Sequence, residues 1–371
     1  MSVSRKPRVA VVFGGRSSEH AVSCSTAASV LSVIDTDKYD VVPIGISHDG
    51  KWVLESGDAE RLALTAGHTP EVNADAAAVV VSQDPARREI VVAGAGETPH
   101  ELGRVDVVFP LLHGPWGEDG TIQGLFEIGG IRYVGSGVLA SAVGMDKHYM
   151  KIVLQAAGLP VTPYVVIKPR QWEQDAPAAR DAVQGLGYPV FVKPARGGSS
   201  MGITKVHDHD GLDAAIAHAH EFDPKVLVES AAEGAREVEC GVLQRPDGGA
   251  DASVVAEVVG YGSHEFYDFE AKYLGEEGVV LEVPADLADG LRDKIQRMSV
   301  LAFEALDCEG LARVDFFVGA EDRVVINEIN TMPGFTPTSM YPRMWAESGV
   351  EYPELVDRLI ALAADRPTGL R

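Results

Sequence analysis

Short apolar runs alternate with stretches of mixed polarity over the first third of the chain. The run at residues 8–13 ends at two glycines, and residues 18–34 then place apolar side chains at helical spacing. Further apolar runs occupy residues 41–47, 105–111 and 131–134. Short buried runs separated by helical segments are typical of a parallel sheet flanked by helices. We therefore predict an N-terminal α/β domain with an open parallel sheet over residues 1–144, within which residues 57–103 show no clear period.

The rest of the chain has the pattern of two α+β units. Residues 147–157 have helical spacing, and a glycine-rich connection joins predicted strands at residues 190–193 and 203–206. A helix over residues 211–220 and a strand over residues 226–229 complete the first unit. Alternating strands dominate the sequence that follows. The predicted domains are residues 145–236 and residues 237–371.

Two alternating runs within residues 311–330 predict a hairpin with polar side chains on one face. The short turn between the runs places Asp315 opposite Glu328 and Arg313 opposite Asn330. Phe317 shares this polar face, and the opposite face is predicted to be core, with Val314, Phe316, Val318, Val325 and Ile329.

The polar face of this hairpin offers two carboxylates and an amide oxygen, from Asp315, Glu328 and Asn330. Such hard oxygen ligands suit Mg²⁺ or Mn²⁺ bound to nucleotide phosphates. The alternative is a solvated face on which Arg313 neutralises the acids. A glycine-bearing loop at residues 331–335 follows directly, where a backbone N–H would face a reacting group, and this favours the metal site.

Other candidate residues lie in or beside loops. Lys193 precedes residues 194–202, whose N–H groups and hydroxyls either close over phosphates or form a mobile hairpin. The loop at residues 113–121 follows a predicted strand, at the end where open α/β sheets bind ligands. Glu19 lies in the first turn of a predicted helix, where it either binds a ligand or complements the helix dipole. Residues 261–274 are polar, aromatic and without period, which makes them a candidate lid.

The charge balance and the length of the apolar runs exclude several classes of protein. With 32 Lys and Arg against 55 Asp and Glu, the net charge of −23 has the wrong sign for nucleic acid or an anionic membrane surface. No apolar run reaches the roughly 20 residues that span a bilayer. The three cysteines are far apart in the sequence, which fits packing residues in a reducing compartment. We expect a cytoplasmic protein with small-molecule substrates, and neither nucleic acid nor a membrane as partner.

Six separated motifs complete the pattern. They are residues 14–20 (GGRSSEH), 113–120 (HGPWGEDG), 145–147 (MDK), 192–194 (VKP) with 198–200 (GSS), 266–273 (FYDFEAKY) and 327–334 (NEINTMPG). With these motifs, the chain resembles the D-alanine–D-alanine ligase family of the ATP-grasp superfamily over nearly its whole length. The resemblance implies an N-terminal open parallel-sheet domain followed by a two-part ATP-grasp fold, made of α+β central and C-terminal domains.

The activity that the resemblance implies is the ATP-dependent ligation of two D-alanine molecules through a D-alanyl phosphate, for peptidoglycan precursor synthesis. Two Mg²⁺ or Mn²⁺ ions and a homodimer are expected. The implied ATP-binding residues are Lys147 and Lys193 for the phosphates, Ser200 in the flap, Glu229 and Glu237 for the adenine and ribose, and Phe317 against the adenine. The implied metal ligands are Asp315, Glu328 and Asn330, the same three that the hairpin indicates.

The resemblance also implies roles in binding the two amino acids. Glu19 would pair with the ammonium of the first D-alanine, backed by His113. The implied residues for the carboxylate of the second D-alanine are Ser339 and Lys272, next to Met340, which stands where leucine is common. Arg313 and the N–H of Gly334 would stabilise the oxyanion, and Tyr273, linked to Ser199 and Glu19, would set the product.

Other functions are weighed against this one. An ester-forming D-alanine–D-lactate ligase or another ATP-grasp ligase is disfavoured by Tyr273, since a tyrosine here accompanies dipeptide formation in the family. A non-catalytic nucleotide-binding protein would not need the metal-binding trio together with Arg313. A dehydrogenase function is disfavoured more strongly, because no G-x-G-x-x-G motif follows the first predicted strand.

Overall fold

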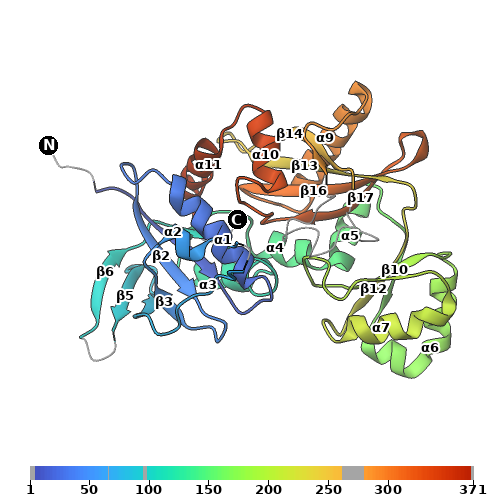
Figure 1. Cartoon of the computed structure of the whole chain (residues 1–371), viewed down its shortest axis with the longest axis horizontal. Helices are drawn as coiled ribbons and strands as arrows, with labels where there is room; N and C mark the ends of the chain where they lie inside the picture. The colour runs from blue at the N-terminus through green and yellow to red at the C-terminus, as the bar shows by residue number, and fades with distance from the viewer. Residues whose placement is uncertain (1–4, 66, 95–97, 261–279, 369–371) are drawn as a thin grey trace.

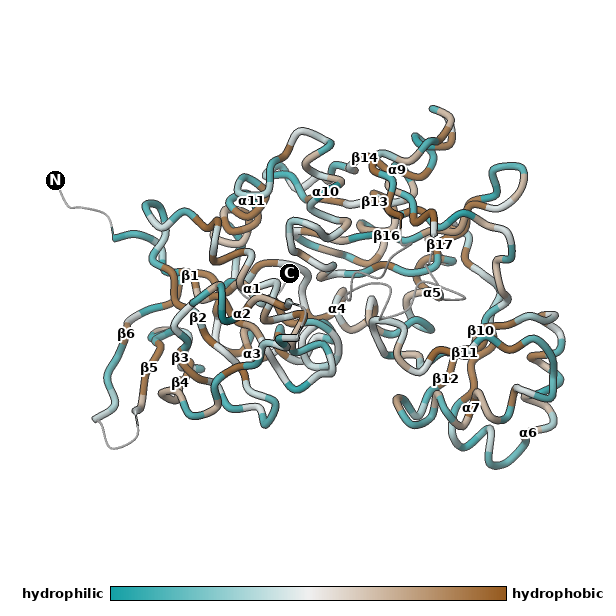
Figure 2. The backbone as a smooth tube through the Cα atoms, viewed as in Figure 1, coloured by the Kyte–Doolittle hydropathy of each residue, from teal (hydrophilic) through white to brown (hydrophobic). Residues whose placement is uncertain are grey.

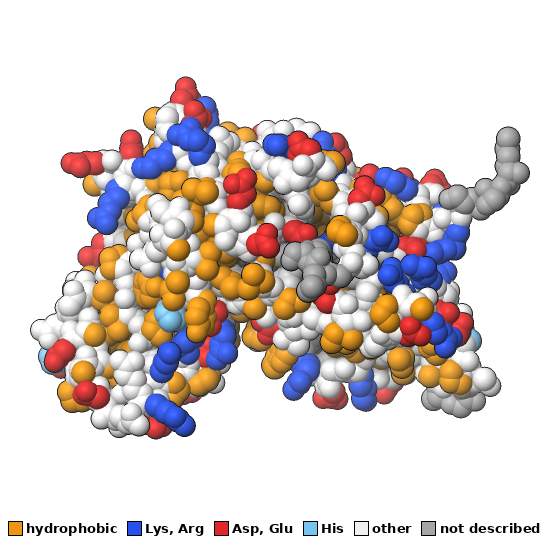
Figure 3. Space-filling view, turned by 180° about the vertical axis from the view of Figure 1, so that it is seen from behind, with side chains coloured by type: hydrophobic (Ala, Val, Ile, Leu, Met, Phe, Trp, Pro, Cys, Tyr) orange, Lys and Arg blue, Asp and Glu red, His pale blue; other side chains and the backbone are white. Residues whose placement is uncertain are grey.

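The computed structural model describes residues 5–65, 67–94, 98–260 and 280–368, which form three lobes (Figure 1). Each lobe is built on one sheet, of eight, four and five strands in chain order. Seen from behind, a notch separates the N-terminal lobe from the central lobe, and acidic and basic side chains are interspersed over this face (Figure 3). Within the described ranges, no helix is both long and apolar enough to span a bilayer.

The N-terminal lobe contains the predicted parallel strands. β1 (Arg8–Gly14) pairs in parallel with β2 (Asp40–Ile46) and β7 (Val107–Pro110), and β7 pairs with β8 (Arg132–Tyr133). The helices of this lobe are α1 (His20–Val33), α2 (Ala59–Leu62), α3 (Thr121–Ile128) and α4 (Val138–Met145). The prediction of an open parallel sheet is confirmed for these four strands.

The stretch without clear period forms one edge of the same sheet. The hairpin of β2 with β3 (Trp52–Leu54) leads into an antiparallel meander, in the sheet order β6-β5-β4-β3-β2-β1-β7-β8. The added strands are β4 (Ala78–Val81), β5 (Glu89–Ala93) and β6 (His100–Arg104). They lie far from the other two lobes in Figure 1.

The central lobe is a small antiparallel sheet covered by helices. Its strands follow the order β11-β10-β12-β9. They are β9 (Tyr164–Ile167), β10 (Val190–Pro194), β11 (Thr204–Val206) and β12 (Val226–Ser230), and the helices are α5 (Lys147–Ala156), α6 (Pro169–Gln184) and α7 (Leu212–His220). Strand β10 and the loop after it face the C-terminal lobe.

The C-terminal lobe carries the predicted hairpin in a five-stranded antiparallel sheet of order β15-β14-β13-β16-β17. Its strands are β13 (Arg236–Gln244), β14 (Ala250–Val258), β15 (Leu281–Glu282), β16 (Leu311–Val318) and β17 (Val324–Asn330), and its helices are α9 (Asp289–Ala305), α10 (Met340–Glu347) and α11 (Tyr352–Asp365).

The last helix joins the C-terminal lobe to the N-terminal one. Leu355 and Leu359 of α11 share one buried cluster with Val11 of β1 and Phe109 of β7. Figure 2 shows hydrophobic segments along the sheet strands and hydrophilic connections around them. Cys24, Cys240 and Cys308 are buried and form no disulfide, as expected of packing residues.

Candidate active site

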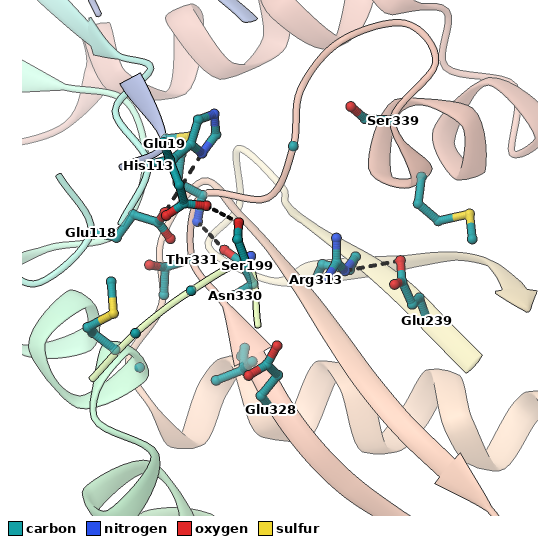
Figure 4. A pocket seen from close by; sticks show the side chains of 18 of the residues that line it. Glu19, His113, Glu118, Ser199, Glu239, Arg313, Glu328, Asn330, Thr331 and Ser339 are labelled. Atoms are coloured by element: carbon teal, nitrogen blue, oxygen red, sulfur yellow. Dashed lines mark hydrogen bonds and ion pairs between the residues drawn. The ribbon is translucent and has the colours of Figure 1, made fainter. Parts of the chain in front are cut away.

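Two pockets meet where the three lobes converge. The first pocket lies between the N-terminal and C-terminal lobes and includes Glu19, His113 and Ser339 (Figure 4). The second pocket lies between the central and C-terminal sheets and includes Lys193 and Phe317. The residues that line both pockets are Lys147, Gly197, Gly198, Ser199, Glu239, Arg313 and Glu328. The pockets therefore form one continuous cleft with a shared middle.

Every predicted site residue that the structure describes lines this cleft. The first pocket takes Glu19, His113, Asn330, Gly334, Ser339 and Met340; the second takes Lys193, Ser200, Glu229, Glu237, Asp315 and Phe317; and Lys147, Ser199, Arg313 and Glu328 lie between them. Lys272, Tyr273 and the candidate lid at residues 261–274 lie outside the described residues.

Glu19 is held at the N-terminal end of α1, directly after the Gly14–Gly15 turn. Its carboxylate accepts a hydrogen bond from the hydroxyl of Ser199, in the loop between β10 and β11 (Figure 4). Gly114 and Gly198 leave room for the carboxylate: a Cβ at Gly114 would collide with it, and one at Gly198 would lie 3.1 Å from Oε2. The predicted loop after Lys193 thus reaches across to the N-terminal lobe.

His113 is buried behind Glu19, at the end of β7. Its Nε2 lies 3.2 Å from the hydroxyl of Thr26, and its Nδ1 lies 3.7 Å from Oε1 of Glu118. Burial by itself would lower the pKa of His113, but the hydrogen bond and charge of Glu118, with the charge of Glu19, raise it. Burial in turn raises the pKa of Glu118. His113 and Glu118 therefore each hold a proton to a higher pH than the same groups would in water.

The register of the β16–β17 hairpin is confirmed at the positions that carry chemistry. Asp315 pairs with Glu328, and Arg313 pairs with Asn330. Arg313 donates to both carboxylate oxygens of Asp315 at 2.7 Å, and its Nε lies 3.1 Å from Oε2 of Glu239 on the neighbouring strand β13. Burial opposes the charge of Arg313, but Asp315 and Glu239 raise its pKa well above the usual value.

The prediction that Val325 belongs to the core is wrong. A bulge follows Asp315 in the register. Phe316 pairs with Ile326, so Asn327 is an extra residue of β17 with no counterpart on β16. The extra residue reverses the alternation of the preceding part of β17. The buried positions there are Val324 and Ile326, whereas Val325 is half-buried opposite Phe317.

The predicted metal ligands fit a divalent cation in their chemistry. Asp315, Glu328 and Asn330 place two carboxylates and an amide on one face of the hairpin, as Mg²⁺ or Mn²⁺ would require. Lys147 lies 3.1 Å from Oε2 of Glu328, and Arg313 covers Asp315, so cations balance both acids. Among the described residues, no three His, Cys, Asp or Glu side chains form a cluster that could hold a metal by themselves.

Lys147 and Lys193 line the second pocket, and each contacts neighbouring oxygens. The Nζ of Lys193 lies 2.5 Å from Oε2 of Glu229 and 3.5 Å from Oδ1 of Asn327. Lys147 donates to the carbonyl of Gly197 at 2.9 Å. Glu229, the implied contact for adenine or ribose, lines the same pocket, with its carboxylate buried and paired with lysines.

Glu237 and Phe317 lie side by side, because they pair across β13 and β16. Both line the second pocket, with Phe317 half-buried on the polar face of the hairpin. A half-buried aromatic ring beside a carboxylate suits a heteroaromatic base attached to a sugar.

The loop after β17 closes the first pocket. The hydroxyl of Ser339 accepts a hydrogen bond from the N–H of Thr336 at 3.1 Å, and a Cβ at Gly334 would lie 3.1 Å from that hydroxyl. Met340, which begins α10, is buried. The loop is thus shaped by its own side chains, with Gly334 facing the cleft.

Two residues of the cleft, Glu118 and Glu239, were missed in the sequence, as was one buried residue beside it, Lys151. Glu118 lies in the motif at residues 113–120. Glu239 lies two residues after Glu237 in the same strand, and this alternation could have indicated it. Nothing in the local sequence marks Lys151 of α5, because its partner Glu229 lies in β12, far away along the chain. Only the fold brings these two charges together.

Comparisons with known proteins agree with this arrangement. The family model described as D-ala D-ala ligase N-terminus matches residues 8–136, and that described as D-ala D-ala ligase C-terminus matches residues 153–361. The D-alanine–D-alanine ligase of Arthrobacter sp. is 58% identical over 368 residues, covering 99% of this chain and 96% of the relative. That of Streptomyces coelicolor is 57% identical over 373 residues, covering 98% and 95%.

Solved structures show the same similarity. The VanG D-Ala:D-Ser ligase from Enterococcus faecalis superposes with a TM-score of 0.82 at 36% identity, covering 97% of this chain and all of the other (100%). The D-alanine–D-alanine ligase from Coxiella burnetii gives a TM-score of 0.81 at 32% identity, covering 98% and 95%.

The three-lobed fold and its continuous cleft define a ligase of the ATP-grasp class. Within that class, the chain belongs to the D-alanine–D-alanine ligase family.

Proposed function

We propose that this protein joins two D-alanine molecules into D-alanyl-D-alanine, with ATP converted to ADP and phosphate, for peptidoglycan precursor synthesis. The observation that carries the proposal is the shared middle of the cleft. Lys147, Ser199, Arg313 and Glu328 line both pockets, so a nucleotide in one and an amino acid in the other would bring phosphate and carboxylate together there.

ATP would occupy the second pocket. Its adenine would pack on Phe317 near Glu237, and its phosphates would extend toward Lys147 and Lys193, beneath the loop that carries Ser200. We propose that Glu229 acts on the nucleotide through its pairing with Lys193. Positioning and charge neutralisation of this kind supply most of the catalysis in phosphoryl transfer.

Divalent cations would be held by Asp315, Glu328 and Asn330, two ions being expected. When bound, Mg²⁺ or Mn²⁺ would neutralise charge on the phosphate oxygens. Arg313 and Lys147 then become available to other groups, because their present partners Asp315 and Glu328 are the proposed metal ligands.

The first D-alanine would occupy the first pocket, with its ammonium on Glu19 and His113 behind it. Its carboxylate oxygen attacks the γ-phosphorus, the bond to ADP breaks, and a D-alanyl phosphate forms. Ser199 would keep the loop closed over this step through its hydrogen bond to Glu19.

The second D-alanine would bind with its carboxylate at Ser339 and Lys272. Its amine attacks the acyl carbon, and the tetrahedral intermediate collapses as phosphate leaves. Arg313 and the N–H of Gly334 would face the oxyanion, and one such donor is worth about 3 kcal/mol. Tyr273 would favour the amide product over an ester.

The acyl phosphate is tested by labelling the carboxylate of D-alanine with ¹⁸O. The mechanism transfers one labelled oxygen to inorganic phosphate in every turnover, which mass spectrometry of the phosphate measures. Phosphate without label, formed together with dipeptide, would contradict the proposed intermediate.

We further propose, on family resemblance, that the protein works in the cytoplasm as a homodimer. Size-exclusion chromatography with light scattering measures the mass in solution. A mass equal to the 39.5 kDa chain would contradict the dimer.

A further inference from the structure

Lys151 is a fully buried lysine for which the proposed mechanism has no use. It lies on α5, one turn after Lys147, and its relative exposure is 0%. It lines neither pocket of the cleft. A buried ammonium is costly unless it is paired, so its partners indicate its role.

The partners of Lys151 come from two strands and one loop, in two lobes. Its Nζ lies 2.6 Å from Oε1 of Glu229 on β12 and donates to the hydroxyl of Thr162 at 3.0 Å. It also donates to the carbonyl of Asn327 on β17 at 3.4 Å. The Thr162 hydroxyl in turn donates to Oε1 of Glu229 at 3.2 Å.

Glu229 therefore sits between two lysines that use different oxygens. Lys151 contacts Oε1, and Lys193 contacts Oε2 at 2.5 Å. The side chains of Lys151 and Glu229 are 1% and 3% exposed, whereas that of Lys193 is 10% exposed and lines the second pocket. Burial would raise the pKa of Glu229, but the two lysines lower it to about 2.

Lys151, Glu229 and Lys193 together carry one positive charge in excess. One carboxylate faces two ammonium groups. A phosphate in the second pocket could therefore bind Lys193, and Glu229 would still have Lys151 as its counter-ion. Without Lys151, Glu229 and Lys193 would form a single buried pair, and moving Lys193 to a phosphate would leave a buried carboxylate unpaired.

We propose that Lys151 is a positioning residue, whose permanent pairing with Glu229 leaves Lys193 available to the phosphates of the nucleotide. This inference rests on the proposed binding of ATP in the second pocket. Lys151 acts through Glu229 and does not contact the substrate.

The test is the KM for ATP of the full-length protein, at saturating D-alanine and Mg²⁺, in the variant Lys151→Met. Methionine keeps an unbranched side chain of similar length without the charge. The expected result is an ATP KM raised about 10- to 100-fold, the equivalent of one charged hydrogen bond, with the D-alanine KM unchanged. An unchanged ATP KM would overturn the proposal.

Lys225→Met is the matched control. Lys225 pairs with Asp146, the N-cap of the same helix, and lines neither pocket. Its loss also removes a largely buried lysine–carboxylate pair, whose side chains are 13% and 10% exposed. Because this pair is separate from Glu229 and Lys193, the expected ATP KM is that of the wild type. A control that raises the ATP KM as much as Lys151→Met would overturn a specific role of Lys151.

A second variant separates charge balance from a structural role. Lys151→Met combined with Glu229→Gln is compared with Glu229→Gln alone. Once the carboxylate is removed, Lys151 has no counter-ion left to hold, so the two variants should have the same ATP KM. A further rise of the ATP KM in the double variant would show that Lys151 acts apart from Glu229 and would overturn the proposal, and this comparison also decides if Lys151→Met alone does not fold.

The proposed function and this inference fail in different ways. Wild-type protein that forms no ADP with Mg²⁺, ATP and D-alanine would contradict the function. Calorimetric titration of ADP into the same variants would still test the pairing, because Lys193 is expected to contact its phosphates. Equal ADP affinity in wild type and Lys151→Met would then overturn the inference.

Discussion

The hydroxyl of Ser199 donates a hydrogen bond to the carboxylate of Glu19, across 180 residues of sequence. This contact links the loop between β10 and β11 to the N-terminal end of α1. The same loop is fixed from the other side by Lys147, whose Nζ donates to the carbonyl of Gly197 at 2.9 Å. The two lobes that would hold the nucleotide and the amino acid are therefore closed on each other at the middle of the cleft.

Replacing Ser199 with alanine should slow turnover without unfolding the protein. The variant loses a hydrogen bond to a charged group, worth about 1.5 to 3 kcal/mol, so we expect kcat/KM for D-alanine to fall roughly 10- to 100-fold. Steady-state kinetics measure this. Ser29→Ala is the control, since its hydroxyl donates only within α1, to the carbonyl of Ser25, and its kinetics should match the wild type.

Glu328→Gln should abolish metal-dependent turnover and leave the fold intact. The side chain of Glu328 is 27% exposed, so its replacement by an isosteric amide costs little stability. Turnover across a Mg²⁺ titration and thermal unfolding together measure the two effects. Glu321→Gln, in the exposed turn of the same hairpin, should behave like the wild type. Near-normal turnover in Glu328→Gln would remove this residue from the metal site.

The buried His113 should make stability fall with rising pH. Its pKa is raised above the ordinary 6.5, mainly by Glu118 against the effect of burial, so the folded protein binds the proton more tightly than the unfolded chain. The stabilisation is complete below pH 6.5 and is lost as the pH rises through the raised value.

Urea unfolding of the wild type and His113→Asn from about pH 6 to about pH 9 measures this effect. The difference in unfolding free energy between the two proteins should shrink with rising pH. The exposed His209 supplies the control His209→Asn, which makes the same substitution at the surface. A pH-independent difference for His113→Asn would show that the histidine is neutral in the folded protein.

Arg366 should anchor the last helix to the N-terminal lobe. Its guanidinium donates to the carbonyls of Tyr133 and Gly135 at 3.0 and 2.7 Å and pairs with Glu309, with the side chain only 7% exposed. Removing one partner of such a buried network typically costs about 3 kcal/mol, so Arg366→Ala should lower the free energy of unfolding by that amount.

The control for this prediction lies on the same helix. Arg358 pairs with Glu354 one turn away, and both side chains are about half exposed, at 48% and 49%. Arg358→Ala should cost less than about 0.5 kcal/mol in the same urea experiment. Equal losses in the two variants would show that the buried contacts of Arg366 contribute no special stability.

The hairpin was the most predictable part of the site. Strand β16 alternates between buried and half-buried positions and the turn is short, so Asp315 and Glu328 could be placed opposite each other from the sequence alone. The bulge at Asn327 could not, because alternation does not reveal an extra residue within a strand. The burial of Val325 was mispredicted for that reason.

Non-local charge pairs and short edge strands were the parts that the sequence could not supply. Strands β5 and β6, at one edge of the sheet, mix polar and apolar positions, and β4 is a four-residue apolar run, so no periodic signal marked them. The pairing of Lys151 with Glu229 depends on how the fold brings α5 and β12 together, which no local pattern encodes. Motif resemblance did place the described site residues in one cleft, since those motifs lie at strand ends and loops that converge.

The most direct test of the proposed function is the identification of products formed from Mg²⁺, ATP and D-alanine. Parallel mixtures contain L-alanine, or D-alanine with D-lactate, and mass spectrometry identifies what is made. We expect D-alanyl-D-alanine and one ADP for each dipeptide from D-alanine, and no dipeptide from L-alanine. Bound ATP without turnover in any mixture would contradict the account and reduce the cleft to a nucleotide-binding site.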